Sequence, residues 1–546
     1  MTRPSVLILL AVSAVPTLAG LAAALWQGMD GDSLLRVLDT PGFGRSIVLS
    51  VWTGAAATAL SLALGHLALA VAVTGGWRRP LRGLSLPLLA MPHLAVGIGL
   101  ALVLAPSGLL LRFLSPWATG FTQPPDWLTV QDPRGLSLIA GLVVKETAFL
   151  VLVLFAALPQ VPAERLLLQA RSLGYGRLKA WLVSVAPLLQ AQIRLPLAAV
   201  LVFGLTNVEM AIPLGPGLPP TFSVVVWRWF VDPDPLTHAQ AYSGALVLLG
   251  VTVLTVLVAA RFARFPALVC RRWAESGSRR DSEAKSRAVL AGAVGAIFLL
   301  GLLALIAIVL RSAGGLWRFP DLLPVRAGWP AWSAAWPAMS AAAGTTAWLA
   351  MGTALIGAVL VLPAAERLRR DPDPRRQIGI LLFLPLMLPQ ITFLFGLQVM
   401  LAWLRIDGTP AAVLWSHLVF ALPYLWGVLA PARAAIEPRY LDVARTLGAG
   451  RARAWLTLTG PLMLRATLLA LALGFSVSVA LYLPTLFAGA GRVATVATEA
   501  ASAAASGTLR PAAAHSMLLA VLPLGAFGLA YAAGTAAFRR RRGMPR

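Results

Sequence analysis

Apolar segments of membrane-spanning length recur along the whole chain and are separated by short polar segments. An α-helix needs about 20 apolar residues to cross the hydrocarbon layer of a bilayer. The pattern therefore predicts six spans in each half of the chain. Those of the first half are 6–26, 46–74, 84–106, 136–158, 190–213 and 241–263. Those of the second half are 288–310, 338–363, 378–404, 411–432, 463–487 and 514–537.

The composition agrees with a membrane protein and excludes several other classes. The 546 residues are 58% hydrophobic and only 12% charged, with a mean hydropathy of +0.80, whereas a soluble domain is about 25% charged. The single cysteine, Cys270, excludes a disulfide framework, and no Cys and His residues have the spacing of a zinc or iron–sulfur site. The sequence predicts an all-α integral membrane protein with no bound metal or cofactor.

Basic residues predict the orientation of the spans. If the N-terminus is cytoplasmic, the inward-facing segments contain most of the 45 Lys and Arg residues, in clusters at 78–82, 171–179, 261–287, 367–376, 433–465 and 539–546. This asymmetry follows the positive-inside rule and predicts a multi-pass protein of the bacterial cytoplasmic (inner) membrane with both termini in the cytoplasm. The net charge of +24 then reflects topology and attraction to anionic lipid headgroups, and we expect no nucleic-acid partner. Segment 6–26 could be a signal peptide, but its apolar length favours an uncleaved first span.

An internal repeat divides the chain into two halves. Residues 170–189 read ARSLGYGRLKAWLVSVAPLL and residues 444–463 read ARTLGAGRARAWLTLTGPLM, which are identical at eleven of twenty positions without a gap. Each copy follows the fourth span of its half, so the halves have parallel topology and a pseudo-twofold axis along the membrane normal. We predict a first half at 1–264 with its core at 46–264, a basic cytoplasmic linker at 265–287, and a second half at 288–546 with its core at 338–540.

Each repeated segment has the pattern of a helix, a turn and a second helix. Gly174 and Gly448 allow the positive φ of a helix C-terminus, and Pro187 and Pro461 suit the first turn of the next helix. A plain cytoplasmic hairpin explains these residues, and shared ancestry preserves some of the rest. Neither explains why Ala-Arg, Gly-x-Gly-Arg and Ala-Trp-Leu keep identical spacing in both copies.

The spacing from glycine to proline in both copies resembles the EAA loop of ABC importer permeases, in which Glu-Ala-Ala precedes the glycine. The second copy matches better, because Asp442 has the acidic position there, whereas Leu168 has it in the first copy. In that family the loop forms a coupling helix that lies in a groove of the ATPase subunit and transmits its movement to the spans. The resemblance implies these ATPase-coupling residues: Ala170, Arg171, Gly174, Gly176, Arg177, Pro187, Asp442, Ala444, Arg445, Gly448, Gly450, Arg451 and Pro461.

The resemblance extends over nearly the whole chain, because two permease modules on one polypeptide are typical of thiamine-type and ferric-iron-type fused permeases. The segments MPHLAVGIGLALVLAPSG at 91–108, PPDWLTVQDPRG at 124–135 and KETAFL at 145–150 are most similar to the thiamine-type group. The resemblance implies an importer permease that forms the pathway for a small solute. Thiamine or a related molecule is the first expectation, and ferric iron is the second.

The chain has no phosphate-binding loop of its own, since GxxxxGK[ST] does not occur in it. The family resemblance therefore implies a separate ATPase dimer on the cytoplasmic side. It also implies a soluble substrate-binding protein on the other side, at segments 107–135, 215–240, 311–337 and 488–513. The five histidines form no local motif and no paired carboxylates stand out, so we do not expect the chain to be an enzyme.

Three charged residues lie inside predicted spans. Lys145 and Glu146 are in the fourth span and Glu209 is in the fifth. Charges at that depth usually face a bundle interior or a transport pathway, so these residues are candidates for lining the pathway. Alternatively, they pair with polar neighbours only to satisfy themselves. The second half has His417 in the corresponding region and no matching charge, which predicts a chemically asymmetric pathway.

Two other functions remain open. A secondary transporter with two sets of six spans also has parallel halves and a charged central linker, and it uses an ion gradient instead of an ATPase. It has no reason to keep a long helical loop after the fourth span of each half. A membrane scaffold or exporter subunit has no support beyond hydrophobicity.

Overall fold

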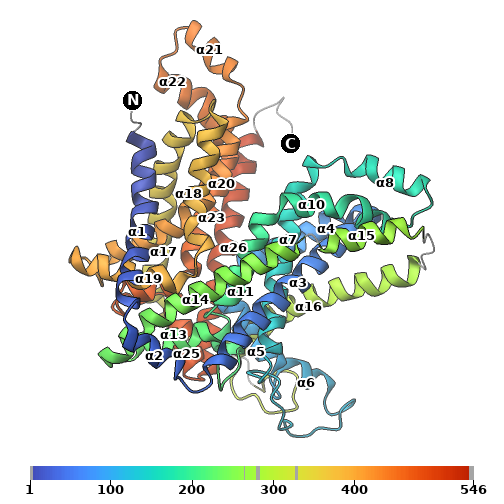
Figure 1. Ribbon diagram of the computed structural model, residues 1–546, viewed down its shortest axis with the longest axis vertical. Coiled ribbons are helices and arrows are strands. Elements are labelled where there is room, and N and C mark those ends of the chain that lie inside the picture. The colour runs from blue at the N-terminus through green and yellow to red at the C-terminus, as the bar shows by residue number, and fades with distance from the viewer. Residues whose placement is uncertain (1–3, 264, 278–282, 326–329, 540–546) are drawn as a thin grey trace. The chain divides into compact units, whose positions relative to one another are not determined.

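The computed structural model describes residues 4–263, 265–277, 283–325 and 330–539 (Figure 1). Within these ranges the chain is mostly helical and has no β-strand. Among the described residues, ten helices are long and apolar enough to cross a membrane, and the number rises to twelve if each of two bent helix pairs is one span. The predicted all-α membrane fold is therefore confirmed.

The chain forms two compact units that are not contiguous in sequence. The C-unit consists of Met1–Trp26, Ser333–Ala500 and Leu518–Arg546, and the N-unit consists of Gln27–Trp332 and Ala501–Met517. The first helix of the chain thus belongs to the unit built mainly from the second half. Conversely, the first helix after the linker belongs to the N-unit. The contiguous halves inferred from the repeat remain a prediction about sequence organisation.

The N-unit contains most of the helices of the first half. They are α2 (Gly31–Leu38), α3 (Phe43–Gly75), α4 (Arg78–Ala90), α5 (His93–Leu104), α6 (Leu109–Leu114), α7 (Leu136–Ala157), η1 (Leu158–Gln160), α8 (Ala163–Ser172), α9 (Arg177–Ala180), η2 (Trp181–Val185), α10 (Ala186–Gln192), α11 (Arg194–Thr206), α12 (Ala211–Leu214), α13 (Phe222–Val231), α14 (Pro235–Phe262), α15 (Phe265–Glu275) and α16 (Glu283–Ala313).

The C-unit contains the first helix and most of the second half. Its helices are α1 (Pro4–Gly28), α17 (Pro330–Arg367), α18 (Pro372–Met387), α19 (Gln390–Trp403), α20 (Pro410–Ala434), α21 (Pro438–Thr446), α22 (Arg451–Ala454), η3 (Trp455–Thr459), α23 (Gly460–Ala480) and α24 (Leu483–Ala488). Two further helices, α25 (Val496–Ala505) and α26 (Leu509–Arg539), each have residues in both units.

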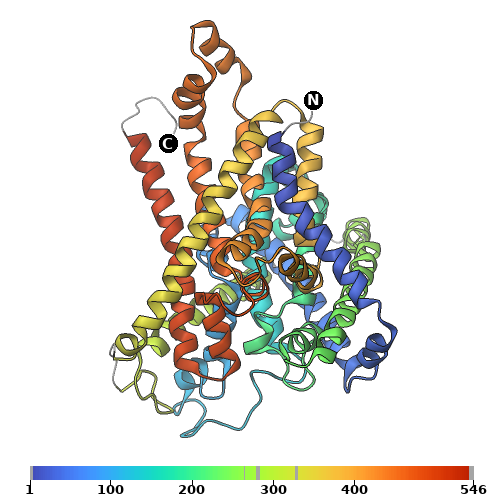
Figure 2. The ribbon, with the colours of Figure 1, turned by 90° about the vertical axis from the view of Figure 1, so that its left-hand side faces the viewer.

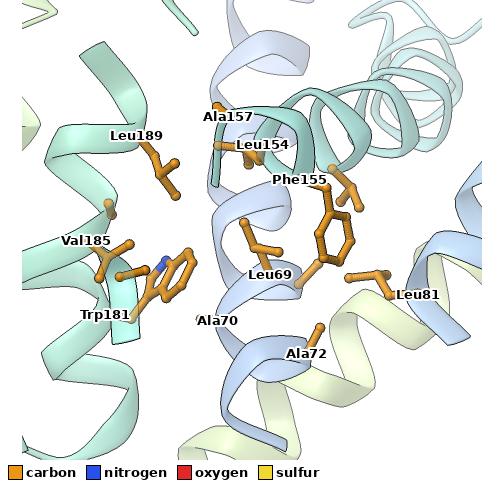
Figure 3. Packing of buried hydrophobic residues seen from close by; sticks show 14 of the residues in the cluster. Leu69, Ala70, Ala72, Leu81, Leu154, Phe155, Ala157, Trp181, Val185 and Leu189 are labelled. Carbon is orange, nitrogen blue, oxygen red and sulfur yellow. The ribbon is translucent and has the colours of Figure 1, made fainter. Parts of the chain in front are cut away.

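The core of the N-unit joins the long helices α3 and α7 to the segment that follows the first repeated turn. Trp181 of η2 is completely buried and belongs to one apolar cluster with Leu69 of α3 and Leu154 of α7. Figure 3 shows the Trp181 ring pointing toward α3 from beside Val185. The η2 segment is therefore anchored in the body of the unit by a large apolar side chain.

Several spans predicted to be continuous are broken. Span 84–106 is two helices, α4 and α5, that meet at Pro92. Span 378–404 is α18 and α19, which are bent by 97° at Pro389. Proline lacks an N–H group and disfavours a helical residue before it, so both breaks have a local cause.

The fifth span of the first half differs most from its prediction. Its helices α10 and α11 belong to a pair bent by 73° near Ile193, and α11 ends at Thr206 with Asn207 in an extended conformation. The predicted continuous span 190–213 is therefore wrong. Likewise, the predicted span 463–487 is interrupted at Leu481, between α23 and α24.

Glycines allow helices to approach closely inside each unit. In the C-unit, a Cβ atom on Gly20 of α1 or on Gly396 of α19 would overlap the backbone of the other helix. In the N-unit, Gly54 of α3 and Gly204 of α11 face each other in the same way. Small residues at such crossings allow backbone contact, which drives helix association in lipid.

The linker between the halves is partly helical. Residues 265–275 form α15 and residues from Glu283 onward begin α16, while 278–282 lie outside the described residues. The helix α15 contacts the η2 segment within the N-unit. This part of the predicted linker 265–287 is thus a packed element of the fold.

A buried carboxylate fixes the start of α7. The Asp132 carboxylate accepts hydrogen bonds from the backbone N–H groups of Arg134, Leu136 and Ser137 at 3.1, 3.0 and 2.9 Å, and from the Ser137 hydroxyl at 2.9 Å. Burial acts to raise the pKa of this carboxyl, but the hydrogen bonds outweigh burial and the pKa is lowered. Asp132 thereby satisfies N–H groups that a helix start leaves without partners.

We expect Asp132→Asn to destabilise the protein by about 1 kcal/mol at pH 7, because the neutral amide is a weaker acceptor for these N–H groups. The folded pKa is lowered, so the contribution of the carboxylate is complete above the unfolded pKa and is lost as the pH falls through the folded pKa. Thermal unfolding in detergent at pH 7 and pH 3 measures both effects. The control is Asp126→Asn, an exposed residue of the same loop. Equal unfolding temperatures for the two variants at pH 7 would contradict the prediction.

Candidate functional site

The two repeated loops have the same backbone turn. Gly174 and Gly448 have φ values of +87° and +82°, which is the conformation that the sequence predicts. In the first loop the N–H of Gly174 donates to the Arg171 carbonyl at 2.9 Å, and the N–H of Tyr175 donates to the Ala170 carbonyl at 3.2 Å. Their counterparts in the second loop make the same two bonds, each at 3.0 Å. Both helices therefore end in a Schellman motif.

The match continues beyond the turn. Gly176 and Gly450 each accept a hydrogen bond on their carbonyl group that begins the next helix, at 2.8 and 2.9 Å. A π-helical turn follows in each copy, as η2 and η3, and Pro187 and Pro461 then lie in the first turn of α10 and α23. Because π-turns are rare, their occurrence at repeat-related positions shows that the two copies share an unusual backbone feature.

The loops differ in how far they are buried. In α8, Leu167 and Ala170 are buried against the N-unit core. In α21 no residue is buried, and Figure 2 shows this segment, in orange, projecting from the end of the C-unit helices. The predicted coupling residues Arg171 and Arg445 are exposed. Of the other predicted arginines, Arg177 is half-buried and Arg451 begins α22.

The linker helix covers the second limb of the first loop. Lys179 is 1% exposed, and its ammonium group lies 4.4 Å from the centre of the Trp273 ring of α15 and 5.6 Å from that of Tyr175. Such cation–π contacts stabilise a desolvated lysine. The repeat-related Arg453 and Trp455 are exposed, so the second loop lacks this cover.

Each loop has one carboxylate paired with an arginine outside the loop. Asp442 lies 3.4 Å from Arg370, which precedes α18, and Glu164 lies 3.5 Å from Arg78, which begins α4. The first copy has a leucine, Leu168, at the acidic position of the loop. Its carboxylate lies one helical turn earlier, at Glu164. Both pairs are largely exposed, so each stabilises the fold by less than about 1 kcal/mol.

Lys145 holds the break between α4 and α5. Its ammonium group donates to the carbonyl oxygens of Leu88 and Leu89, at 2.8 and 2.7 Å, and of Met91. These carbonyls lie at the C-terminal end of α4, where helical partners are missing. The Lys145 side chain is 4% exposed. It therefore supplies the hydrogen bonds and the positive charge that a helix C-terminus favours.

The two candidate glutamates are also buried. Glu146 is hydrogen-bonded through Oε1 to Nε2 of His93, the first residue of α5, at 3.0 Å. Glu209 lies in the turn between α11 and α12 rather than within a span, and it is 8% exposed. Lys145 interacts electrostatically with both glutamates. The structure thus brings Lys145, Glu146 and Glu209 into one buried charge cluster, which also includes His93.

The second half has hydroxyl groups in the region where the first half has charges. His417 of α20 is hydrogen-bonded to Ser478 of α23 at 2.7 Å and to Thr485 of α24 at 2.9 Å. All three side chains are buried. This network connects the two helices across the break at Leu481, and the described part of the C-unit shows no charge in it.

Two interactions were not expected from the sequence. The hydrogen bond between His93 and Glu146 was not predicted. The sequence does show that His93 directly follows Pro92, a residue at which a helix can begin. Glu366 of α17 and Arg433 of α20 form a bidentate ion pair in which Arg433 is 2% exposed. It fastens the base of α20 directly before the second loop. Among the described residues no three His, Cys, Asp or Glu side chains are grouped as metal ligands.

We expect Lys145→Met to lower the stability of the protein by about 3 kcal/mol, because two buried carbonyl groups and one partly buried carbonyl group lose their donor while the side-chain volume is kept. The control is Leu150→Met, a change of similar volume at a buried position of the same helix that removes no hydrogen-bond donor. Thermal unfolding in detergent measures both. If Lys145→Met unfolds at the wild-type temperature, Lys145 does not hold the break.

The chain matches no protein-family model. It is 32% identical over 449 residues to the inner membrane ABC transporter permease protein YnjC of Escherichia coli strain K12, covering 81% of this chain and 78% of that protein. The relationship thus includes most of both polypeptides, in agreement with the paired loops and the many apolar helices. The chain therefore belongs to the family of ABC transporter permeases.

Proposed function

We propose that this protein is the permease subunit of a binding-protein-dependent importer in the bacterial inner membrane, with both termini in the cytoplasm. A separate ATPase dimer docks on the two repeated loops, and a soluble binding protein delivers the solute on the opposite side. The observation that carries the proposal is the matched backbone of the two loops, from the Schellman glycine to the π-turn. Thiamine or a related small molecule is the first substrate candidate, and ferric iron is the second.

The loops are suited to pass movement from the ATPase to the spans. In the first loop, α8 and the η2 segment form one packed body with α3 and α7. Movement of α8 by the closing ATPase dimer then displaces α10 and α11, which follow η2 without an intervening loop. The bend near Ile193 and the break at Asn207 allow these pieces to move as rigid bodies.

The buried charge cluster is the proposed lining of the solute pathway in the N-unit. It lies where α5, α7 and α12 pack together. Lys145 holds the broken span, while Glu146 and Glu209 supply negative charge that suits a cationic solute such as thiamine. Discontinuous helices with polar residues at the break are the usual site of solute binding in transporters.

The family relationship disfavours a secondary transporter, because an ABC permease works with an ATPase. The family relationship does not give the direction of transport. We propose import because both loops resemble the EAA loop of importer permeases.

Co-purification with a candidate ATPase tests the proposal. We expect wild-type protein to retain the ATPase and the Gly174→Pro, Gly448→Pro double variant to lose it, because proline fixes φ near −65° and cannot form either turn. The control is the double variant with asparagine at both positions, since asparagine tolerates positive φ. A wild-type protein that retains no ATPase and transports on an ion gradient alone would overturn the assignment.

Uptake by proteoliposomes with the ATPase and binding protein tests the substrate and the pathway. We expect thiamine uptake that Glu209→Gln reduces about tenfold, because the variant removes negative charge from the proposed pathway. The control is Asp373→Asn, an exposed carboxylate at the start of α18 that lies outside both loops and the charge cluster. Uptake of ferric iron but not thiamine would establish the second candidate, and unchanged uptake by Glu209→Gln would remove this residue from the pathway.

A further inference from the structure

A basic pocket lies beside the first loop. Its volume is about 350 Å3, and it is lined by Arg78, Arg171, Arg177 and Glu164, together with Val73, Leu167 and Leu168. All seven residues belong to the N-unit. Two of the arginines flank the Gly174 turn, so the pocket is formed by the proposed coupling loop and the start of α4.

The pocket has an excess of positive charge. Among the described residues that line it, three are arginines and one is a glutamate, and Glu164 is paired with Arg78 at 3.5 Å. The Glu164 side chain is 81% exposed, so it screens the pocket weakly. An anionic group that enters the pocket would gain charge-assisted hydrogen bonds, and a carboxylate fits the fork of an arginine side chain.

In the second loop, the group that pairs with an arginine is a carboxylate of the chain itself. Asp442 has the position in the repeat that Leu168 has in the first loop, and its carboxylate lies 3.4 Å from Arg370. Arg445 matches Arg171 in the repeat. In the second half the chain thus supplies its own carboxylate, whereas in the first half an exposed leucine stands there, with 66% of its surface accessible.

We propose that the pocket receives a carboxylate side chain of the ATPase subunit, and that in the second loop the Asp442 carboxylate, paired with Arg370, takes the place of that side chain. The inference rests on the proposed function. Two identical ATPase subunits would then dock unequally, with one acidic side chain bound at the first loop and its copy held away from the second loop by Asp442. A carboxylate is favoured over a lipid phosphate because the internal group that completes the second site is a carboxylate.

The variant Leu168→Asp tests the proposal. It places a carboxylate of the chain itself among the three arginines, where it competes with the partner. We expect ATPase retention to fall about fivefold in 50 mM salt and to approach the wild-type value in 1 M salt, where charge interactions are screened within about 3 Å. The probe is the ATPase that the wild-type protein retains in the co-purification experiment.

Two controls separate charge from shape. Leu168→Asn has nearly the same size without the charge and should retain the ATPase at the wild-type level. Asp373→Asn changes an exposed carboxylate at the start of α18, outside both loops, and should also retain the ATPase at the wild-type level. Size-exclusion profiles and unfolding temperatures equal to those of the wild type establish that the variants are folded.

Three results would overturn the proposal while leaving the proposed function intact. The first is equal or stronger ATPase retention by Leu168→Asp. The second is an equal loss with Leu168→Asn, which would indicate a packing contact. The third is unchanged ATPase retention with reduced binding of anionic lipid by native mass spectrometry, which would identify a lipid phosphate site. If the wild-type protein retains no ATPase, the proposed function fails before this experiment begins.

Discussion

Lipid offers no hydrogen bonds, so every break in a membrane-spanning helix needs partners from the protein itself. Most features of this structure follow from that constraint. Lys145 supplies donors to the carbonyl groups at the end of α4, and Asn207 accepts the N–H of Met210 at 2.7 Å where α11 stops. In the second half, His417 connects α23 and α24 across their break. Polar residues are therefore concentrated where the spans are interrupted, and a solute pathway needs them at the same places.

The repeated loops of the two halves have the same backbone but different side-chain surroundings. Their repeated loops agree in turn type, hydrogen bonds and π-helical position, which are backbone properties. They differ in neighbours, because the linker helix α15 packs on the first loop within the N-unit. Lys179 is buried beneath Trp273, whereas its counterpart Arg453 is exposed. A duplicated module on one chain can thus keep a common mechanical element while its two surfaces diverge.

The sequence predicted the parts of the fold that depend on local chemistry. Apolar length indicated the spans, and Gly174 and Gly448 indicated turns that have the expected φ. The breaks at Asn207 and Leu481 were missed, because the apolar segments on the two sides of each break together have the length of one span. The contact of Lys145 with α4 was also beyond the sequence, since it joins residues more than fifty positions apart. The roles of the coupling and pathway residues remain predictions.

The first helix of the chain packs inside the unit built from the second half, where Gly20 and Gly396 touch through their backbones. The helix α1 thus packs against a partner that is synthesised more than 370 residues later. Until that partner is made, α1 contacts lipid or chaperones of the insertion machinery. Cutting the gene at the linker would leave each fragment without a helix that its compact unit requires. The linker is therefore more than a tether between two modules, because each compact unit includes a helix from the other half of the chain.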